Sequence, residues 1–389
     1  MVQLFDVCIR GAGVVGQSLA LLLAQQRLRV GLVQAHPAPN NPSDGQDIRA
    51  YALNTASRHM LQALRCWPEG AAITPVKAMR VFGDLGSEVN FDAPPMAAPP
   101  PPSDANPTAA LAWIVDVPAL DTSLATALRF QPHIELLTTP QPATLTVVCE
   151  GRISSTRSEF GVEMDVTPYG QDAIAARLTC SQSHQGLAQQ WFSQGEVLAL
   201  LPLQGETGNS VALVWSVSEQ RAQALLDLSP EDFSQAVQTA SSLAGMPTLG
   251  DLRLSGERAR WPLQHGLAQR WSGKTAAGQA WVLAGDAAHT VHPLAGQGLN
   301  LGLADVAELA RILGARDYWR AVDDARLLRL YERTRRAGLA PIGAVMDGLQ
   351  RLFAQTDAPL QTLRNLGLRS FERSGPLKDW TVRQAMGLG

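Results

Sequence analysis

The hydrophobic pattern of the first 34 residues predicts a strand, a helix and a second strand. Leu4–Arg10 is a short apolar run with β-branched residues at Val7 and Ile9, which is typical of a buried strand. Val14–Gln26 has the apolar spacing of a helix, and Arg29–Gln34 is a second short apolar run. This order makes a β-α-β unit, the context in which a dinucleotide-binding fold begins.

The middle of the chain predicts a mixture of strands and helices. Helical spacing occurs over Ala50–Trp67 and Leu120–Phe130, and strands are expected over Met79–Phe91 (two, around a turn), Leu111–Asp116, Ile134–Leu137 and Thr144–Cys149. Strand patterns dominate from about residue 160 to 265, apart from a helical hairpin around Gln220–Ala244. The segment APPMAAPPPPSDANP, residues 93–107, contains too much proline for a helix or sheet and predicts an exposed loop.

Towards the C-terminus, Ala280–Ala284 predicts another buried strand, and the chain from Gly298 onward is mostly helical. The whole order predicts an α/β fold (α+β overall), with a Rossmann-like nucleotide-binding domain, an inserted mixed or antiparallel β-sheet domain and a helical C-terminus. We expect the nucleotide-binding domain to comprise residues 1–76, 108–160 and 265–320. The sheet-rich substrate domain would comprise residues 77–107 and 161–264, and the helical region residues 321–389.

Composition and charge argue against several classes of protein. The chain has 389 residues, 46% of them hydrophobic, and a formal net charge of −3, whereas nucleic-acid-binding proteins usually carry a basic excess. Its apolar runs are shorter than the ~20 residues of a transmembrane helix, and the N-terminus leads into a strand rather than a signal peptide. Four widely spaced cysteines, Cys8, Cys66, Cys149 and Cys180, are expected to be buried, reduced thiols. We therefore expect a cytoplasmic protein, at most peripheral to the inner membrane.

Three glycines, Gly11, Gly13 and Gly16, follow the first strand and open the first helix. Glycine lets the backbone approach a phosphate closely, and the start of a helix attracts negative charge. The same spacing also occurs by chance in loops, so the turn alone is weak evidence. Its meaning depends on a second stretch, WVLAGDAAHTVHPLAGQGLNLGLADVAELARIL, which covers Trp281–Leu313.

That second stretch combines a strand end, a glycine-rich loop and a helix start. The strand ends at Gly285-Asp286, and Pro293 and Gly296-Gln297-Gly298 precede the helix. An aspartate at the carboxyl end of a strand accepts hydrogen bonds from sugar-type hydroxyls, and the glycines let backbone N–H groups approach a flat ligand. The start of the helix favours negative charge on whatever is bound there.

The segment GDAAHTVHPLAGQGLNLGLAD, Gly285–Asp305, resembles the second FAD-binding signature of the group A flavoprotein monooxygenases, which share the para-hydroxybenzoate hydroxylase fold. Four further segments resemble the ubiquinone-biosynthesis hydroxylases within that group: DIRAYALNTAS (Asp47–Ser57), GLAQQWFSQGEVLALLPL (Gly186–Leu203), LYERTRRAG (Leu330–Gly338) and SGPLKDWTVRQAMG (Ser374–Gly387). The resemblance covers essentially the whole chain and implies an FAD-dependent aromatic-ring monooxygenase.

The resemblance also implies roles for individual positions. The glycine turn would face the FAD pyrophosphate, Arg49 would approach the flavin, and Asp286 would hold the ribityl chain. The implied cofactor-binding residues are Gly11, Gly13, Val15, Gly16, Gln34, Arg49, Glu150, Gly151, Gly285, Asp286, Pro293, Gly296, Gly298, Leu299 and Asn300. Pro293, Gly296, Gln297 and Gly298 would line the reacting ring of the flavin, and Leu201 and Pro202 would belong to the substrate pocket.

Three positions depart from the pattern of this family. Gln34 stands where relatives carry an acidic residue for the adenosine ribose, and an amide lacks the charge-assisted strength of a carboxylate. Glu150 replaces the aspartate of an Asp-Gly signature, here EGRISSTR, and Val117 stands where many relatives have asparagine. These departures leave two alternatives open: other flavin chemistry on the same fold (halogenation, epoxidation or isoprenoid reduction), or a non-catalytic scaffold in a biosynthetic complex.

Two other pairs have simpler interpretations. His289 and His292 are three residues apart, as some metal ligands are, but no carboxylate or cysteine has matching spacing. We therefore expect no metal site and a structural role for His289. Glu308 and Arg311 have the spacing of a solvated ion pair on a helix.

The reaction that the resemblance implies uses NAD(P)H and O2. NAD(P)H, bound transiently, would reduce FAD, and one oxygen atom of O2 would then pass to an electron-rich ring. The substrate would be a lipophilic, polyprenylated phenol on the route to ubiquinone. Because such a substrate is lipophilic, we expect the protein to contact a membrane surface and other ubiquinone-biosynthesis proteins.

Overall fold

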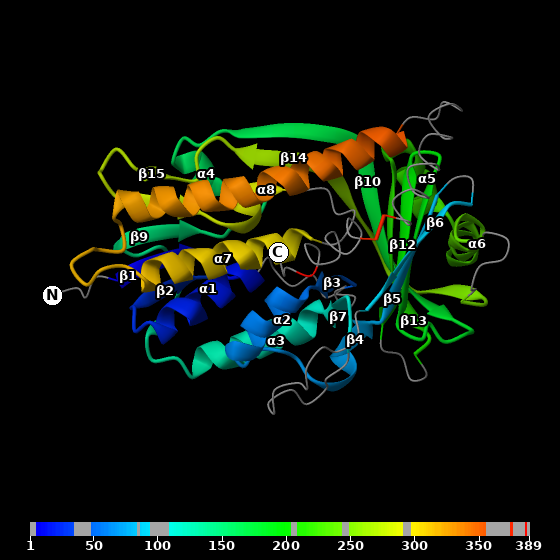
Figure 1. Cartoon of the computed structure of the whole chain (residues 1–389), viewed down its shortest axis with the longest axis horizontal. Helices are drawn as coiled ribbons and strands as arrows, with labels where there is room; N and C mark the ends of the chain where they lie inside the picture. Colours follow the sequence, from blue (N-terminus) through cyan, green and yellow to red (C-terminus); the bar gives the residue numbers. More distant parts are fainter. Residues whose placement is uncertain are drawn as a thin grey trace.

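The computed structural model describes residues 5–34, 48–83, 86–93, 109–203, 208–242, 249–290 and 297–354, together with residues 374, 375 and 386. Pro293 and Gly296, two of the predicted site residues, lie outside this part of the chain, as does nearly all of the proline-rich segment 93–107. The described chain forms three sheets, and Figure 1 shows the largest of them at one end of the molecule and the parallel sheet at the other.

A six-stranded sheet carries the predicted β-α-β unit. Its strands, in spatial order, are β15 (Ser272–Lys274), β16 (Ala280–Leu283), β9 (Ala143–Val148), β1 (Phe5–Arg10), β2 (Val30–Val33) and β8 (Ile134–Leu137). All except the edge strand β15 run parallel, and α1 (Val14–Gln25) makes the crossover from β1 to β2. The turn after β1 therefore lies at the carboxyl edge of the sheet, where folds of this kind bind ligands.

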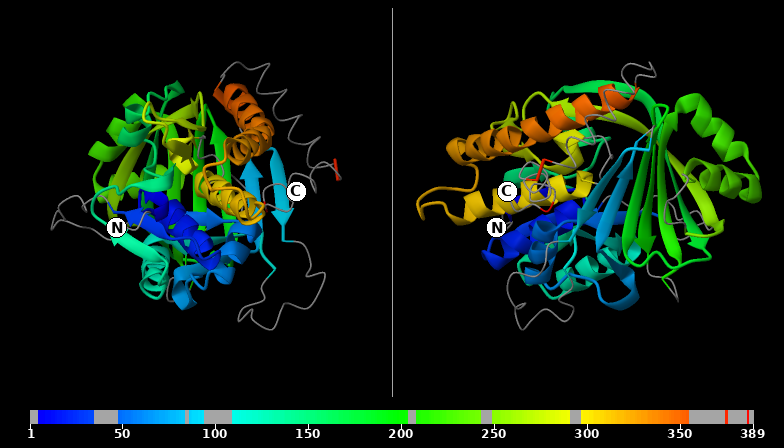
Figure 2. Two further views of the ribbon diagram at one scale, coloured as in Figure 1. Left: turned by 90° about the vertical axis from the view of Figure 1, so that its left-hand side faces the viewer. Right: turned by 45° about the vertical axis from the view of Figure 1, so that its right-hand side comes forward.

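An eight-stranded sheet forms the other end of the molecule. Its strands, in spatial order, are β17 (His289–Thr290), β14 (Leu252–Ala268), β10 (Met164–Cys180), β13 (Ser210–Ser218), β12 (Glu196–Leu203), β11 (Leu187–Ser193), β5 (Ala78–Phe82) and β6 (Glu88–Asp92). Helices α5 (Glu219–Asp227) and α6 (Pro230–Ala240) cover its outer face, as Figure 2 shows. Its inner face is turned towards the rest of the molecule.

A small antiparallel sheet of β3 (Ala50–Leu53), β7 (Ala112–Asp116) and β4 (Ile73–Val76) completes the architecture. The prediction of a helix from Ala50 to Trp67 is wrong at its start, because Ala50–Leu53 pairs with β7 and the helix α2 covers only Thr55–Ala63. Asn54 separates the two elements, since its side chain accepts a hydrogen bond from the Ser57 N–H at 2.9 Å and so caps the helix.

Most of the remaining helices pack on the strands or on one another. They are the 3-10 turns η1 (Gly70–Ala72) and η2 (Gly285–Ala287), and the helices α3 (Val117–Arg129), α4 (Ser155–Glu159), α7 (Gly298–Gly314) and α8 (Ala325–Ala354). Helix α7 lies between α1 and α8 in Figure 1 and contacts both. Tyr331 of α8 is fully buried and donates a hydrogen bond to the carbonyl of Leu283, which joins α8 to β16.

Two further expectations concern the cysteines and membrane-spanning helices. All four cysteines are free and buried. No helix within the described ranges is both long and apolar enough to cross a bilayer.

Candidate active site

A single cavity of about 710 Å³ brings the two predicted cofactor segments together. It is lined by Gly13 and Val15 of the first turn, and by Gly285, Asp286, Gln297, Gly298 and Leu299 of the second stretch. Arg49, Gly151 and Leu201 also line it. The cavity thus joins the carboxyl edge of the six-stranded sheet to the inner face of the eight-stranded sheet.

The three glycines of the first turn have different structural roles. Gly11 has a φ of 111°, and a Cβ there would lie 2.4 Å from the carbonyl oxygen of Cys149. A Cβ on Gly16 would lie 1.9 Å from the carbonyl oxygen of Gly11. A Cβ on Gly13, by contrast, would have no neighbouring atom within 4 Å. Gly11 and Gly16 therefore permit close packing of strand and helix, while Gly13 leaves the backbone open to a ligand.

The Gly285-Asp286 turn presents a carboxylate to the same cavity. Gly285 has a φ of 62°, in the left-handed region that favours glycine, and directs the chain out of β16. Asp286 is exposed to the cavity although protein surrounds it on most sides. This partial desolvation raises the pKa of Asp286 above its ordinary value, while the charges of His289 and Arg152 oppose the rise.

The start of α7 forms the next part of the cavity wall. Gln297, Gly298 and Leu299 line it. Among the described residues no side chain caps the first turn of α7 or of α1, so backbone N–H groups at both helix starts are available to an anionic ligand.

Asn300 is one of the predicted cofactor-binding residues, but its side chain forms hydrogen bonds within the protein. It is 3% exposed, and its Oδ1 accepts hydrogen bonds from the Asn54 N–H at 3.0 Å and the Ser57 hydroxyl at 2.8 Å. Its Nδ2 donates to the carbonyl of Ala52 at 2.8 Å. Asn300 therefore fastens α7 to the junction of β3 and α2, and is not among the described residues that line the cavity.

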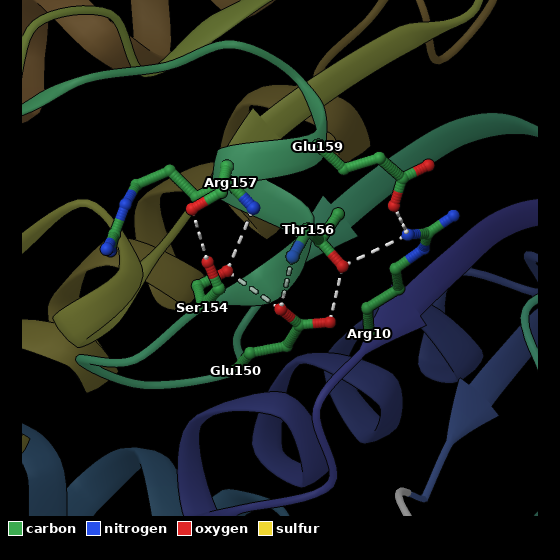
Figure 3. A network of polar contacts seen from close by, with 7 residues as sticks. Arg10, Glu150, Ser154, Thr156, Arg157 and Glu159 are labelled. Atoms are coloured by element: carbon green, nitrogen blue, oxygen red, sulfur yellow. Dashed lines mark hydrogen bonds and ion pairs between the residues drawn. The ribbon is translucent and has the colours of Figure 1, made fainter.

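Glu150, which begins the EGRISSTR segment, also supports the cavity from outside its lining. The Glu150 carboxylate accepts hydrogen bonds from the Ser154 hydroxyl at 2.7 Å and the Thr156 N–H at 3.0 Å, and a third from the Thr156 hydroxyl. Arg10, at the end of β1, donates to Thr156 and to Glu159, as Figure 3 shows. Glu150 thus anchors its own loop and positions Gly151, which has a φ of 80° and lines the cavity.

Arg157 of the same signature reaches the second cofactor segment. Its guanidinium donates to the carbonyl of Ala287 at 3.1 Å and to the carbonyl of Arg152 at 3.1 Å. Burial lowers the pKa of Arg157, although the charge of Glu150 works in the other direction. The EGRISSTR loop and the Gly285-Asp286 turn are therefore held together by one side chain.

The remaining departures from the family pattern lie at the edges of the site. Gln34 follows β2 with an exposed side chain, next to the glycine turn, because Gly11 N–H donates to the carbonyl of Val33. Val117 is buried at the start of α3. Arg49 is exposed and lines the cavity just before β3.

The inner face of the eight-stranded sheet forms the far wall. On its central strands most of the lining side chains are small, whereas larger ones, Phe91, Trp261 and Leu263, line the cavity from the outer strands β6 and β14. The side chains that line the cavity from β10 to β13 include Ala173, Ala175, Ala188, Val197, Ala199, Leu201, Ala212, Val214 and Ser216. Between them, Ile174, Trp191, Leu198, Leu200 and Trp215 pack beneath α5 and α6. Since side chains alternate along a strand, the same strands carry large residues on one face and small ones on the other.

Leu201 and Pro202 are separated by this alternation. Leu201 lines the cavity. Pro202 is not among the described lining residues, and its position next to Leu201 in β12 turns it to the opposite face.

Comparison with known proteins identifies the family. The FAD binding domain family matches residues 139–341 of this chain. Ubiquinone hydroxylase UbiL of Rhodospirillum rubrum is 31% identical to it, over 98% of this chain and 89% of the relative. The chain belongs to the FAD-dependent ubiquinone-biosynthesis hydroxylases. The 3-demethoxyubiquinol 3-hydroxylase of Escherichia coli is 29% identical, over 98% of each chain.

Solved structures confirm the α/β fold class. The p-nitrophenol 4-monooxygenase PnpA from Pseudomonas putida superposes with a TM-score of 0.73 over 99% of each chain, at 18% identity. PqsL from Pseudomonas aeruginosa gives a TM-score of 0.70 over 95% of this chain and 100% of its own, also at 18% identity. This ubiquinone-biosynthesis hydroxylase is an FAD-dependent monooxygenase, as the sequence predicts.

The cavity of this hydroxylase fits FAD. Gly13 provides a turn without side-chain obstruction, and the start of α1 provides N–H groups for a diphosphate. Asp286 offers a carboxylate for hydroxyl groups, and a Cβ on Gly298 would have no neighbouring atom within 4 Å, so the start of α7 is open to a flat ring. FAD bound there supplies the redox chemistry.

Sequence reasoning missed two residues of this hydroxylase that support the site, Asp305 and Arg335. His289 Nε2 lies 2.7 Å from the carboxylate of Asp305, and Arg335 of α8 donates to the other oxygen of that carboxylate at 2.7 Å. Burial raises the pKa of Asp305, but His289 and Arg335 outweigh it, so the pKa lies below its ordinary value. The structural role expected for His289 agrees with this contact and with its stacking on Trp271.

Met386 is a third such residue. It lines the cavity, and its carbonyl accepts a hydrogen bond from the Ala56 N–H at 3.4 Å. Met386 belongs to the SGPLKDWTVRQAMG segment, for which the sequence predicts no role at the site. Within the described ranges, no three His, Cys, Asp or Glu residues are grouped to hold a metal ion.

Proposed function

We propose that this monooxygenase hydroxylates the ring of a phenol that carries an isoprenoid chain, with NAD(P)H as electron donor. The overall reaction converts the phenol, O2, NAD(P)H and a proton into the hydroxylated phenol, NAD(P)⁺ and water. The observation that carries the proposal is the shape of the cavity, which extends from the cofactor turns to an apolar wall of small side chains. The names of the relatives, hydroxylases of ubiquinone synthesis, agree with such a substrate.

The small side chains of the wall leave room for an apolar chain. Ala175 pairs with Val214 in the sheet register, and Val214 pairs with Ala199, so two alanines flank one valine in a single row. In the next row, Ala173 and Val197 both pair with Ser216. A branched hydrocarbon chain laid against this face is removed from water, which stabilises its binding by roughly 25 cal/mol for each Å² of apolar surface.

Most of the polar groups that could bind a cofactor lie at the other end of the cavity, although Gln190 and Ser216 are polar side chains of the wall itself. Asp286, the N-terminus of α7 and the open backbone at Gly13 face the cofactor region. The dipole of α7 favours negative charge on the group bound at its start. The apolar wall keeps water away from the reacting ring, which suppresses release of hydrogen peroxide in place of ring hydroxylation.

A reconstituted assay tests this proposal. The purified protein is loaded with FAD and given NADH or NADPH together with a phenol that bears a three-unit isoprenoid chain beside its hydroxyl group. We expect the phenol to stimulate oxidation of the nicotinamide and to gain one oxygen atom by mass spectrometry. A flavin-loaded protein that oxidises NAD(P)H only to hydrogen peroxide, with every phenol tried, would argue for a different reaction.

The same proposal places the enzyme in the cytoplasm at the surface of the membrane that holds its substrate. Tyr318 and Trp319, between α7 and α8, are 95% and 66% exposed and lie edge to face. Aromatic side chains with one polar end favour the membrane–water interface. We expect the protein to float with liposomes, and a Tyr318→Ser/Trp319→Ser variant to float less. Equal flotation of both proteins would mean that Tyr318 and Trp319 do not contribute to membrane binding.

A further inference from the structure

Asp305 is a fully buried carboxylate in α7 that makes no contribution to the cavity lining of the described residues. Its Oδ2 accepts hydrogen bonds from the Gly285 N–H at 2.9 Å and from His289 Nε2 at 2.7 Å. Its Oδ1 accepts a hydrogen bond from Arg335 Nε at 2.7 Å. A buried carboxylate is stable only when such partners compensate for lost hydration. Here the partners come from three separate elements: η2, β17 and α8.

The hydrogen bond from the Gly285 N–H lies at the point where the backbone leaves the sheet. The preceding N–H, that of Ala284, still donates to the carbonyl of Val148 in the sheet at 3.0 Å. The next N–H belongs to Gly285, where the chain turns into the left-handed region and leaves the sheet. The Asp305 carboxylate therefore fixes the first peptide of the turn that carries Asp286 into the cavity.

Gly302, one turn earlier in α7, allows this contact. A Cβ there would lie 2.9 Å from Val15 Cγ2 and 3.4 Å from the Cα of Gly285. Helix α7 can therefore approach the turn closely, and residues three apart share one helix face. Asp305 reaches the Gly285 N–H from that same face.

Arg335 connects this contact to α8. Its side chain is 14% exposed and also donates to the carbonyl of Leu301 at 3.3 Å. Like Asp305, it is not among the described residues that line the cavity. Any influence of Arg335 on the cofactor is therefore indirect, through its partners on α7, of which Asp305 makes the shorter and charge-assisted contact.

We propose that Asp305 is the positioning residue of the FAD site and that Arg335 acts through it, so that FAD affinity depends on α8. Asp305 orients the Gly285-Asp286 turn, and Arg335 holds Asp305 in that orientation. This inference rests on the FAD site of the family and not on the identity of the phenol. It can therefore hold or fail independently of the proposed reaction.

The test compares adjacent arginines with the same substitution. Arg335→Met removes the partner of Asp305, whereas Arg336→Met removes contacts to Glu332 and to the carbonyl of Gln269 on the surface. FAD is titrated into each apoprotein by flavin fluorescence. We expect the Kd for FAD to rise about tenfold or more in Arg335→Met, and to change less than about twofold in Arg336→Met. Visible circular dichroism of the bound flavin should change only in the first variant.

A second matched pair lies on α7. Asp305→Asn places an amide NH2 group among three donors, and we expect the same loss of FAD affinity and the same change in circular dichroism. Glu308→Gln alters the pair with Arg311, whose guanidinium is exposed, and should leave both unchanged. If Arg335→Met does not fold, Arg335→Lys retains the charge but not the Nε geometry and should raise the Kd at least about threefold.

A purely structural role predicts a different result. In that case the melting temperature of the Arg335 and Asp305 apoproteins would fall, while the Kd for FAD and the flavin circular dichroism stayed at their original values. That result, in Asp305→Asn together with either Arg335 variant, overturns the proposal.

Discussion

Asn300 and Asn54 are 246 residues apart in the chain, and the Asn300 side chain accepts a hydrogen bond from the Asn54 backbone N–H at 3.0 Å. The same oxygen accepts a hydrogen bond from the Ser57 hydroxyl, and the amide nitrogen donates to the carbonyl of Ala52. Through these contacts one buried amide joins the start of α7 to the end of β3. Both elements line the cavity, so the contact determines how far apart two of its walls lie.

Replacement of this amide should loosen the cavity before it unfolds the protein. Asn300→Ala leaves the Asn54 N–H and the Ser57 hydroxyl without their acceptor, and each buried unpaired group costs about 1–3 kcal/mol. We expect urea denaturation of the apoprotein to show a loss of about 2–4 kcal/mol, and FAD binding to weaken. Asn300→Asp retains the acceptor but places a buried carboxylate oxygen opposite the carbonyl of Ala52, so it should lose at least as much stability. An unchanged free energy of unfolding in Asn300→Ala would contradict this assignment.

The glycine turn allows effects on folding and on ligand binding to be separated. Gly16→Ala places a Cβ 1.9 Å from the carbonyl oxygen of Gly11, which no rotamer relieves. We expect this variant to lose about 3 kcal/mol or more, or not to fold. Gly13→Ala meets no neighbouring atom within 4 Å and lies at a cavity-lining position.

Gly13→Ala should therefore keep the melting temperature of the apoprotein within a few degrees and still weaken FAD binding. The added methyl group would occupy the space through which the backbone approaches the diphosphate. Thermal denaturation and an FAD titration on the same preparations check both statements. Equal losses of stability in the two variants would show that the turn has only a packing role.

Sequence patterns predicted the elements that depend on neighbouring residues. The strand and helix on either side of Gly11 follow from local periodicity, and the glycines carry their own conformational reason. The helix expected from Ala50 failed at its start because the pairing partner of Ala50–Leu53 is β7, some sixty residues later. Periodicity within one segment contains no information about such a partner.

The same limit applies to the site residues. Glu150 and Asn300 were expected to contact the cofactor, since their positions match the family motif. The structure uses both to fasten loops behind the cavity wall. The role of Asp305 could not be predicted from the sequence, because its partner Arg335 lies 30 residues further along the chain, on a different helix. Whether a polar residue faces a ligand or a neighbouring loop is decided by packing between distant segments.

Cys66 provides a prediction about pH. Burial raises the pKa of the Cys66 thiol to about 11, and the thiol donates a hydrogen bond to the carbonyl of Leu64. The unfolded chain releases this proton near pH 9, where the folded protein still holds it. The contribution of Cys66 to stability is therefore fully present below pH 9 and declines as the pH rises towards about 11.

Cys66→Ser isolates this contribution, because serine keeps a donor for Leu64 and does not titrate in this range. We expect the free energy of unfolding of the unmodified protein to fall more steeply than that of the variant between pH 9 and 11, by on the order of 1 kcal/mol per pH unit. Urea denaturation at a series of pH values measures the difference. Parallel curves would mean that the thiol titrates alike in both states.

Ala199 offers a steric test of the cavity wall. It lies on β12, faces the cavity and flanks Val214 together with Ala175. Ala199→Leu fills part of the space assigned to the isoprenoid chain, and one or a few methylene groups in an apolar pocket change specificity by about tenfold or more. We expect kcat/KM for a phenol with a three-unit isoprenoid chain to fall at least about tenfold relative to the same phenol with a methyl group instead.

Ala125→Leu is the matched control, since Ala125 is exposed on α3, away from the eight-stranded sheet. The ratio of the two kcat/KM values should not change in this variant, because the added side chain faces water. FAD content and melting temperature, measured for both variants, separate a narrowed groove from a damaged fold. An equal loss with both phenols in Ala199→Leu would place the chain elsewhere, because a group that blocks only the chain cannot reduce turnover of a substrate that lacks it.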